Sequence, residues 1–291
     1  MLKQESQTIS HKLIGAIFTS KVSSYLSPLI ELLVSLGFIN VWEGIYSCWE
    51  DARQDSNIFE EKIWINKLTN QVQKNITDYR SKNNSHLAPP AQDHILSLAA
   101  GVLFSPSEDN LQVLDFGGGL GTSYFRLISS LPESKKVEFH IVELKIICDL
   151  AQNFLGDFPQ LHFYKTLPNL SKPVHIIHLG SSIQYAPDWK DLLAKLANYR
   201  SHILILEELP AGDIPSFIST QNYYGKKLQC HFFNINELIE EVQTLGYELI
   251  YKSRCPQNYA GKPGEPLPMK NFPSQFRLDF FSNLMFKRIK H

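Results

Sequence analysis

Two patterns of hydrophobic and polar residues divide this chain near residue 105. Up to that point apolar residues recur at helical spacing, in residues 25–39, 58–73 and 93–104. Apolar side chains spaced three and four residues apart are typical of helices that bury one face. We therefore expect residues 1–105 to form a helical cap at the N-terminus.

From Leu111 onward, short apolar runs alternate with helical patterns. The apolar runs predict seven strands: Val113–Phe116, Val137–Val142, Leu161–Tyr164, Val174–Leu179, His202–Leu206, Tyr247–Tyr251 and Leu284–Phe286. The helical patterns occupy Thr122–Leu131, Ile146–Leu155, Trp189–Tyr199 and Ile235–Leu245. Because such alternation favours right-handed crossovers, residues 106–291 are expected to form an α/β fold with a doubly wound, mostly parallel, seven-stranded Rossmann-like sheet. A proline-rich loop at residues 256–273 precedes the C-terminal strand.

The composition of the chain limits the kinds of partner molecule and metal site that are expected. Lysine and arginine total 28 against 29 aspartate and glutamate residues, which gives a net charge of -1. Proteins that coat nucleic acid usually carry a basic excess, so we expect no nucleic-acid partner. The four cysteines form no Cys-x-x-Cys pair, and the ten histidines form no His-x-His or His-x-x-x-His pair. Neither a disulfide framework nor a metal site is therefore expected.

The chain is expected to be cytoplasmic, without a transmembrane segment. Its first residues lack the apolar core of a secretory signal. The apolar stretch at residues 25–39 is shorter than the ~20 residues that span a bilayer, and it contains Pro28 and Glu31. A helix packed on the protein body is the favoured interpretation, and peripheral membrane contact is the alternative.

A glycine-rich turn joins the first expected strand to the helix that follows it. Asp115 lies near the end of the strand, and Gly117, Gly118, Gly119 and Gly121 precede the helical pattern. Glycine has no Cβ, so the main chain can bend sharply there and a ligand can approach it closely. The unpaired N–H groups at the start of the helix face the same space. The turn is therefore the candidate cofactor site.

The glycine spacing separates two classes of cofactor. The dinucleotide pattern G-x-G-x-x-G requires glycine where Thr122 or Tyr124 stands. The alternating pattern D-x-G-x-G-x-G is complete from Asp115 to Gly121. In this the chain resembles class I S-adenosylmethionine-dependent methyltransferases, which implies S-adenosyl-L-methionine as the cofactor and methyl transfer by in-line displacement. An acidic residue that ends the second strand can bind a ribose, and Glu143 stands in that place.

The resemblance becomes narrower at two other segments. Gly44–Ala52 is similar to the G-x-Y-x-x-W-x-x-A segment of one largely uncharacterised bacterial methyltransferase family, which often accompanies surface-polysaccharide genes. Ser181–Tyr185 is similar to that family's S-S-x-x-Q-Y signature. The resemblance implies a small-molecule or glycan acceptor, with a hydroxyl as the expected methyl acceptor. It also makes Tyr46, Ser181 and Gln184 candidate cofactor contacts.

The sequence indicates less clearly which residues would bind the methyl acceptor. Ligands of open α/β sheets bind at the carboxyl ends of the strands, which nominates Tyr185 and Glu207 as catalytic residues. His231 precedes the last helix and is a third catalytic candidate, as a base. His178 lies inside the fourth expected strand and is interpreted as a hydrogen-bonded core residue. Two alternatives stay open: an NAD(P)-dependent oxidoreductase, and a non-catalytic nucleotide-binding module with the same fold.

Overall fold

The computed structural model of the chain describes seven segments. They are residues 40–55, 58–81, 95–103, 110–131, 136–223, 225–255 and 266–289. Contacts between residues divide the chain into two compact units, each built from separate parts of the sequence. One unit holds a four-stranded sheet and the other a seven-stranded sheet. They are called here the four-stranded unit and the seven-stranded unit.

The seven-stranded sheet confirms the predicted fold class. Its strand order is β10-β11-β6-β5-β2-β3-β4. The strands are β2 (Leu111–Phe116), β3 (Val137–Val142), β4 (Leu161–Tyr164), β5 (Ile176–Gly180), β6 (Ile203–Leu209), β10 (Tyr247–Cys255) and β11 (Phe281–Arg288). The five strands from β6 to β4 are parallel, and β11 runs antiparallel to β6. Because the chain leaves β2 toward β3 on one side and reaches β5 on the other, the order reverses between β2 and β5, where open α/β sheets bind ligands.

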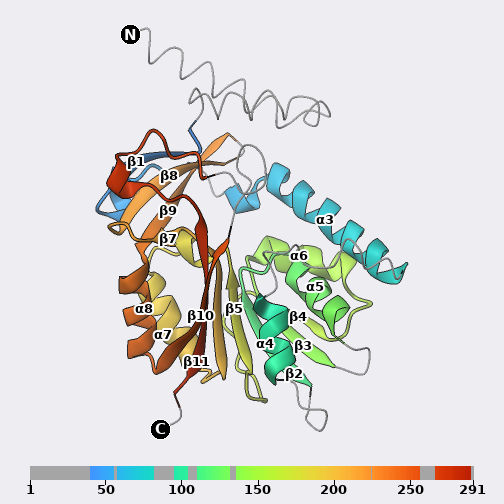
Figure 1. Cartoon of the computed structure of the whole chain (residues 1–291). Helices are drawn as coiled ribbons and strands as arrows, with labels where there is room; N and C mark the ends of the chain where they lie inside the picture. The colour runs from blue at the N-terminus through green and yellow to red at the C-terminus, as the bar shows by residue number, and fades with distance from the viewer. Residues whose placement is uncertain are drawn as a thin grey trace. The chain divides into compact units, whose positions relative to one another are not determined.

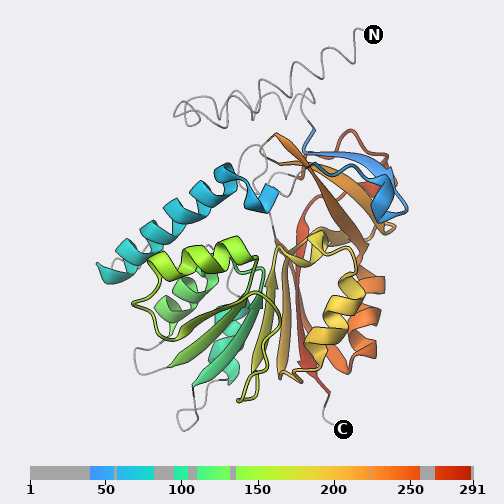
Figure 2. The ribbon, with the colours of Figure 1, turned by 180° about the vertical axis from the view of Figure 1, so that it is seen from behind.

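Helices cover both faces of this sheet (Figures 1 and 2). They are α4 (Ile95–Leu103), α5 (Thr122–Ser130), α6 (Lys145–Phe154), α7 (Trp189–Ala197) and α8 (Ile235–Thr244). A further helix, α3 (Lys62–Arg80), contacts the start of α5 through a hydrogen bond from Asn75 to Thr122. The helices α4, α5 and α6 lie on one face, and α7 and α8 lie on the other. Strands that are covered on both faces read as continuous apolar runs, which is why β2 and β5 could be recognised in the sequence.

Aromatic packing fixes α5 against the sheet. Phe125 of α5 and Phe139 of β3 are fully buried, and the ring of Tyr124 meets both of them edge-on. Phe158 packs edge-on against Phe125 with ring centroids 5.0 Å apart. Edge-to-face pairs add to the stabilisation that comes from burying apolar area. The start of α5, and with it the end of the glycine turn, therefore rests on a closely packed core.

The four-stranded unit contains β1 (Trp42–Tyr46), β7 (Ala211–Gly212), β8 (Phe217–Tyr223) and β9 (Lys226–Asn234), in the order β1-β8-β9-β7. The strand β8 is antiparallel to β1 and to β9, whereas the short strand β7 runs parallel to β9. Trp42, Phe217 and Phe232 form the centre of its apolar core, where the rings of Phe217 and Phe232 stack 4.7 Å apart. Phe272, from the described segment 266–289, packs against both of those phenylalanines.

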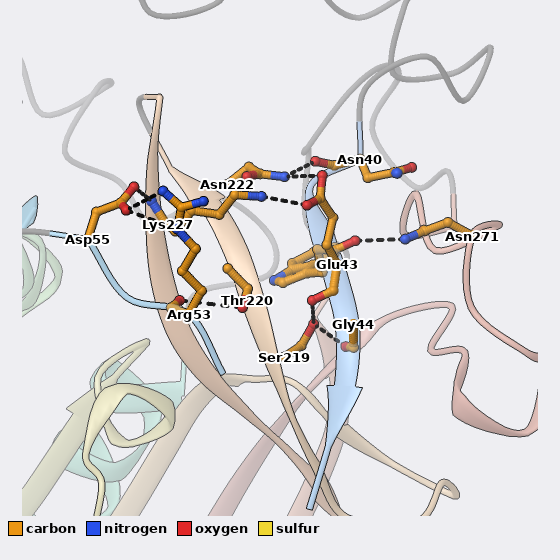
Figure 3. Close-up of polar contacts among 11 residues, drawn as sticks. Asn40, Glu43, Gly44, Arg53, Asp55, Ser219, Thr220, Asn222, Lys227 and Asn271 are labelled. Atoms are coloured by element: carbon orange, nitrogen blue, oxygen red, sulfur yellow. Dashed lines mark hydrogen bonds and ion pairs between the residues drawn. The ribbon is translucent and has the colours of Figure 1, made fainter. Parts of the chain in front are cut away.

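Polar contacts hold β1 in this sheet (Figure 3). Lys227 of β9 forms an ion pair with Glu43 of β1, and the Asn222 amide donates to the same carboxylate at 2.9 Å. The Ser219 hydroxyl donates to the carbonyl of Gly44 at 2.9 Å, and the Asn271 amide donates to that of Trp42 at 2.7 Å. These contacts join β1 to residues far away in the sequence, which is why no local pattern predicts this strand.

The outcome for the expected helical cap is mixed. The helices α3 and α4 lie where helical patterns were found, whereas Trp42–Tyr46 is a strand. Residues 25–39 lie outside the described residues. The expected domain boundary at residue 105 stays a prediction. Among the described residues, no helix combines the length and hydrophobicity needed to cross a bilayer.

Candidate functional site

The glycine turn between β2 and α5 has a backbone that only glycine adopts easily. Gly117, Gly119 and Gly121 have φ angles of 74°, 58° and 80°, in the left-handed region that disfavours other residues. Gly118 is restricted by contact instead, because a Cβ there would lie 2.2 Å from Oδ2 of Asp115. A side chain at position 118 would therefore displace a buried carboxylate.

Glu143 lies against this turn. It follows β3, and its carboxylate accepts hydrogen bonds from the N–H of Gly119 at 2.9 Å and from that of Leu144 at 2.8 Å. Burial raises the pKa of Glu143, the two N–H donors lower it, and the nearby charge of Asp115 raises it further. The acid that the sequence nominates at the end of the second strand thus contacts the glycine turn directly.

A buried histidine joins two carboxylates at the carboxyl ends of β2, β5 and β6. Asp115 and His178 are register partners on neighbouring parallel strands. Nδ1 of His178 lies 2.8 Å from Oδ1 of Asp115, and Nε2 lies 2.9 Å from Oε2 of Glu207. The exposed fractions of the three side chains are 1% for Asp115, 2% for His178 and 12% for Glu207. We call these three residues the Asp–His–Glu array.

The two carboxylates determine the charge of the histidine. Burial by itself lowers the pKa of His178, but the charges and hydrogen bonds of Asp115 and Glu207 outweigh it and raise the pKa to about 10. An imidazolium with an acceptor on each nitrogen has both of its donors satisfied. The ring of His178 is therefore an imidazolium around neutral pH, held between the side chains of Asp115 and Glu207.

Three buried acceptor oxygens near this edge of the sheet lack a hydrogen bond from the described residues: Oδ2 of Asp115, Oε1 of Glu207 and Oε1 of Gln184. Leaving a buried acceptor unpaired costs about 1–3 kcal/mol, and more when it is charged. Native proteins carry few such groups, and functional sites are one place where they occur. A ligand that brings N–H or O–H donors, or an ammonium group, would satisfy these oxygens.

Two non-glycine residues with left-handed φ angles lie at the same edge of the sheet, near the carboxyl ends of β5 and β6. Ser181, after β5, has φ 52°, and Glu208, near the end of β6, has φ 54°. Non-glycine residues in this region cost of order 1–3 kcal/mol and cluster at functional sites. The N–H of Ser181 donates to the carbonyl of Glu207, and the N–H of Glu208 donates to Oδ1 of Asn283. These bonds hold the two strained residues in place.

The loop after β5 is tied to the end of β2. The Ser182 hydroxyl donates to the carbonyl of Phe116 at 2.7 Å, and a Cβ on Gly117 would lie 2.6 Å from the Cβ of Ser182. The Gln184 side-chain amide donates to the Ser181 hydroxyl at 3.0 Å. Ser181, Ser182 and Gln184 therefore tie the loop after β5 to the end of β2, and the buried side-chain oxygen of Gln184 has no hydrogen-bond donor among the described residues.

The nominated residues fall into two groups. The seven-stranded unit holds Asp115, Gly117, Gly118, Gly119, Gly121, Glu143, Ser181, Gln184, Tyr185 and Glu207. Tyr185 is half-buried in a short 3-10 turn, Ile183–Tyr185. Tyr46 and His231 belong to the four-stranded unit, where His231 stacks on Trp49 with ring centroids 4.5 Å apart. The roles of all these residues stay predictions.

The sequence pattern does not indicate that His178 contacts two ionisable residues. Its interpretation as a hydrogen-bonded core residue is correct as far as burial goes, but both of its partners are ionisable residues at the carboxyl edge of the sheet. A signal did exist: a histidine two residues before the end of a strand that pairs with the Asp115 strand. Within the described segments, no group of three histidine, cysteine, aspartate or glutamate side chains is arranged to hold a metal ion.

Comparison with known proteins gives similarity at the level of structure only. No protein-family model matches the chain, and no curated protein matches it. Solved structures do resemble it. They include the 1,6-didemethyltoxoflavin-N1-methyltransferase of Burkholderia thailandensis, which is 13% identical with a TM-score of 0.42, and which aligns over 81% of this chain and 94% of its own.

Two further similar structures are also methyltransferases. CcbJ from Streptomyces caelestis is 12% identical with a TM-score of 0.44 and aligns over 69% of this chain and 91% of its own. A S-adenosylmethionine-dependent methyltransferase from Clostridium acetobutylicum is 11% identical with a TM-score of 0.43 and aligns over 68% and 91%. Because these identities and TM-scores are low, the functional argument for this chain depends on its own topology and site geometry.

Proposed function

We propose that this protein is a class I S-adenosyl-L-methionine-dependent methyltransferase that methylates a hydroxyl of a small-molecule or glycan acceptor. One observation carries the proposal: a left-handed glycine turn at the carboxyl end of β2 lies in contact with the Glu143 carboxylate, beside the reversal in strand order. Ligands of open α/β sheets bind at this reversal, and an acid after the neighbouring strand binds ribose hydroxyls.

The polar groups of the turn suit the parts of that cofactor. S-Adenosylmethionine has no pyrophosphate, so it does not need the third glycine of the dinucleotide pattern. Its ribose offers two hydroxyl donors to Glu143, and its amino-acid end offers an ammonium group to the unpaired oxygens of Asp115 and Gln184. Unpaired acceptors that a cation can satisfy support a site of this kind.

When bound, the cofactor supplies the methyl group, whose bond to sulfur breaks as the bond to the acceptor oxygen forms, with the electron pair remaining on sulfur. The protein must bring the two reactants into line and accept the proton that the hydroxyl loses. Glu207 is the candidate acceptor of that proton in the seven-stranded unit, because its Oε1 is buried and has no hydrogen-bond donor among the described residues. Tyr185 and His231 remain candidates for contacts with the acceptor.

Calorimetric titration tests the cofactor class. We expect S-adenosylhomocysteine to bind saturably, and NAD and NADP to give no heat above dilution. Saturable binding of NAD or NADP without binding of S-adenosylhomocysteine would favour the oxidoreductase alternative and contradict the proposal. For the variants Glu143→Gln and Glu207→Gln, the matched control is Glu248→Gln, because Glu248 is an exposed carboxylate of the same unit, on β10.

A further inference from the structure

The Asp–His–Glu array joins two places in the fold that have different expected ligands. Asp115 lies beneath the glycine turn, where a Cβ on Gly118 would overlap its carboxylate. Glu207 lies on β6, opposite Gly180, two strands away from β2. His178 of β5 contacts both carboxylates. The array therefore links the end of β2, beside the glycine turn, to the end of β6, along the edge of the sheet where ligands of open α/β folds bind.

The number of protons in the array follows from its geometry. Each of the two N···O contacts, at 2.8 and 2.9 Å, requires one proton between its atoms. A neutral imidazole supplies only one of them, so the second must come from an imidazolium or from a protonated carboxyl group. The carboxylates favour the imidazolium by their charge. Among the described residues, Asp115 and Glu207 are the charged groups that act on the pKa of the ring.

One oxygen of Glu207 remains for a ligand. Oε2 is bound to His178, whereas Oε1 is buried and accepts nothing from the described residues. The main chain on either side of Glu207 is fixed by the bonds from Ser181 and to Asn283. The carboxylate is thus anchored through one oxygen, and the other is a buried acceptor that receives no donor from the described residues.

We propose that His178 is a positioning residue, an imidazolium around neutral pH that orients Glu207 so that its Oε1 receives a hydrogen-bond donor from the methyl acceptor. This inference rests on the proposed methyltransferase function and extends it. The acceptor is then a molecule with an O–H or N–H group at the reacting atom, since a group without a hydrogen would leave Oε1 buried and unpaired.

Sinefungin tests the proposal without knowledge of the acceptor. In this compound an amine on carbon replaces the methyl-bearing sulfonium, so it places a donor where the transferred group would be. Wild-type protein is expected to bind sinefungin about tenfold more tightly than S-adenosylhomocysteine, as suits one charge-assisted hydrogen bond. In Glu207→Gln this preference should fall to about twofold or less, while S-adenosylhomocysteine affinity changes by no more than about twofold. In His178→Gln the preference, measured against the S-adenosylhomocysteine affinity of the same variant, should fall likewise. Glu248→Gln should retain the full preference.

Nitrogen-15 spectra of the histidine rings provide a second readout, with His178→Gln used to assign the signals. In the wild type at pH 8 both ring nitrogens of His178 should be protonated. In Glu207→Gln the ring should lose its proton at a lower pH than it does in the wild type. A neutral His178 at pH 8 would overturn the proposal, and so would an unchanged sinefungin preference in Glu207→Gln. If the wild type fails to bind S-adenosylhomocysteine at all, the methyltransferase function itself is contradicted, which is a distinguishable result.

Discussion

Asp115 and His178 meet across the two strands where the sheet reverses its order, with Nδ1 of the histidine 2.8 Å from Oδ1 of the aspartate. Both side chains are almost fully buried. A buried charged pair is costly unless its hydrogen-bonding groups are satisfied, and Glu207 on the far side of the ring is the partner of the second ring nitrogen. The site is therefore an electrostatic unit whose members depend on one another.

This unit predicts a loss of stability in alkaline solution. The pKa of His178 is raised from 6.5 to about 10, so the folded protein retains a proton that the unfolded chain releases. The contribution is complete below pH 6.5 and disappears as the pH rises through about 10. It should amount to roughly 2–4 kcal/mol of unfolding free energy.

Denaturant unfolding between pH 6 and pH 10 measures this effect. In His178→Gln the decline assigned to His178 should be absent, and the variant should already be less stable at pH 6.5. His202→Gln, which changes an exposed histidine of the same unit, should keep the wild-type decline. An identical alkaline decline in His178→Gln and in the wild type would contradict the assignment.

A second histidine, His140, is expected to make the unfolding free energy fall as the solution becomes acidic. Burial, aided by the neighbouring His162, lowers the pKa of His140 to about 4. Its ring nitrogens lie 3.0 Å from Oε1 of Gln112 and 3.1 Å from the Tyr164 hydroxyl, partners that suit a neutral ring with one donor and one acceptor. Stability from this group is present above pH 6.5 and is lost as the pH falls through about 4.

The expected acid loss is about 2–3 kcal/mol of unfolding free energy. Unfolding curves of His140→Gln between pH 7 and pH 4 should show a shallower decline than those of the wild type, by that amount. Equal slopes for the two proteins over this range would show that His140 titrates normally in the folded state.

Replacement of Gly118 by alanine should damage the cofactor site. The new methyl group would overlap the Asp115 carboxylate, which is fully buried and held by His178. We expect Gly118→Ala to lower the unfolding free energy by about 1–3 kcal/mol and to weaken S-adenosylhomocysteine binding at least about tenfold. Calorimetry and denaturant unfolding of the same preparation measure both quantities.

Gly101 provides the matched control. It lies in α4, and a Cβ there would have nothing within 4 Å. Gly101→Ala should leave binding unchanged and raise the unfolding free energy by up to ~1 kcal/mol, because alanine favours helix. Wild-type affinity in Gly118→Ala would mean that the turn does not seat the cofactor.

The charge of Glu143 should matter more than its shape. Glu143→Gln preserves the size of the side chain but removes the negative charge that faces Gly119 and the ribose position. Charge-assisted hydrogen bonds contribute about 1.5–3 kcal/mol, so S-adenosylhomocysteine should bind about 10- to 100-fold more weakly. Titration calorimetry compares the S-adenosylhomocysteine affinity of Glu143→Gln with that of Glu248→Gln. Equal affinities in the two variants would show that Glu143 does not bind the cofactor.

The parts of the site that local patterns encode could be predicted from sequence. The glycine turn follows an apolar strand and precedes a helical pattern, and Glu143 directly follows the next apolar strand. Strand-to-helix turns of this kind are read from neighbouring residues alone. Accordingly the seven strands and the helices α5 to α8 lie close to their expected positions.

The parts that depend on pairing between distant segments could not be predicted in this way. His178 contacts Asp115 across 63 residues, and the bond that joins Ser219 to the β1 backbone spans 175. In β8 the polar residues Ser219, Thr220 and Gln221 are all buried, so the alternation that reveals a half-exposed strand is missing. Partners far away in the chain decide both the four-stranded sheet and the charge of the Asp–His–Glu array.

A crystal structure of the protein with S-adenosylhomocysteine bound tests the account most directly. It should show the nucleoside against the Gly117–Gly121 turn, with a ribose hydroxyl within hydrogen-bond distance of the Glu143 carboxylate. Electron density for the ligand elsewhere in the fold, or at the turn with Glu143 directed away from the ribose, would contradict the assignment.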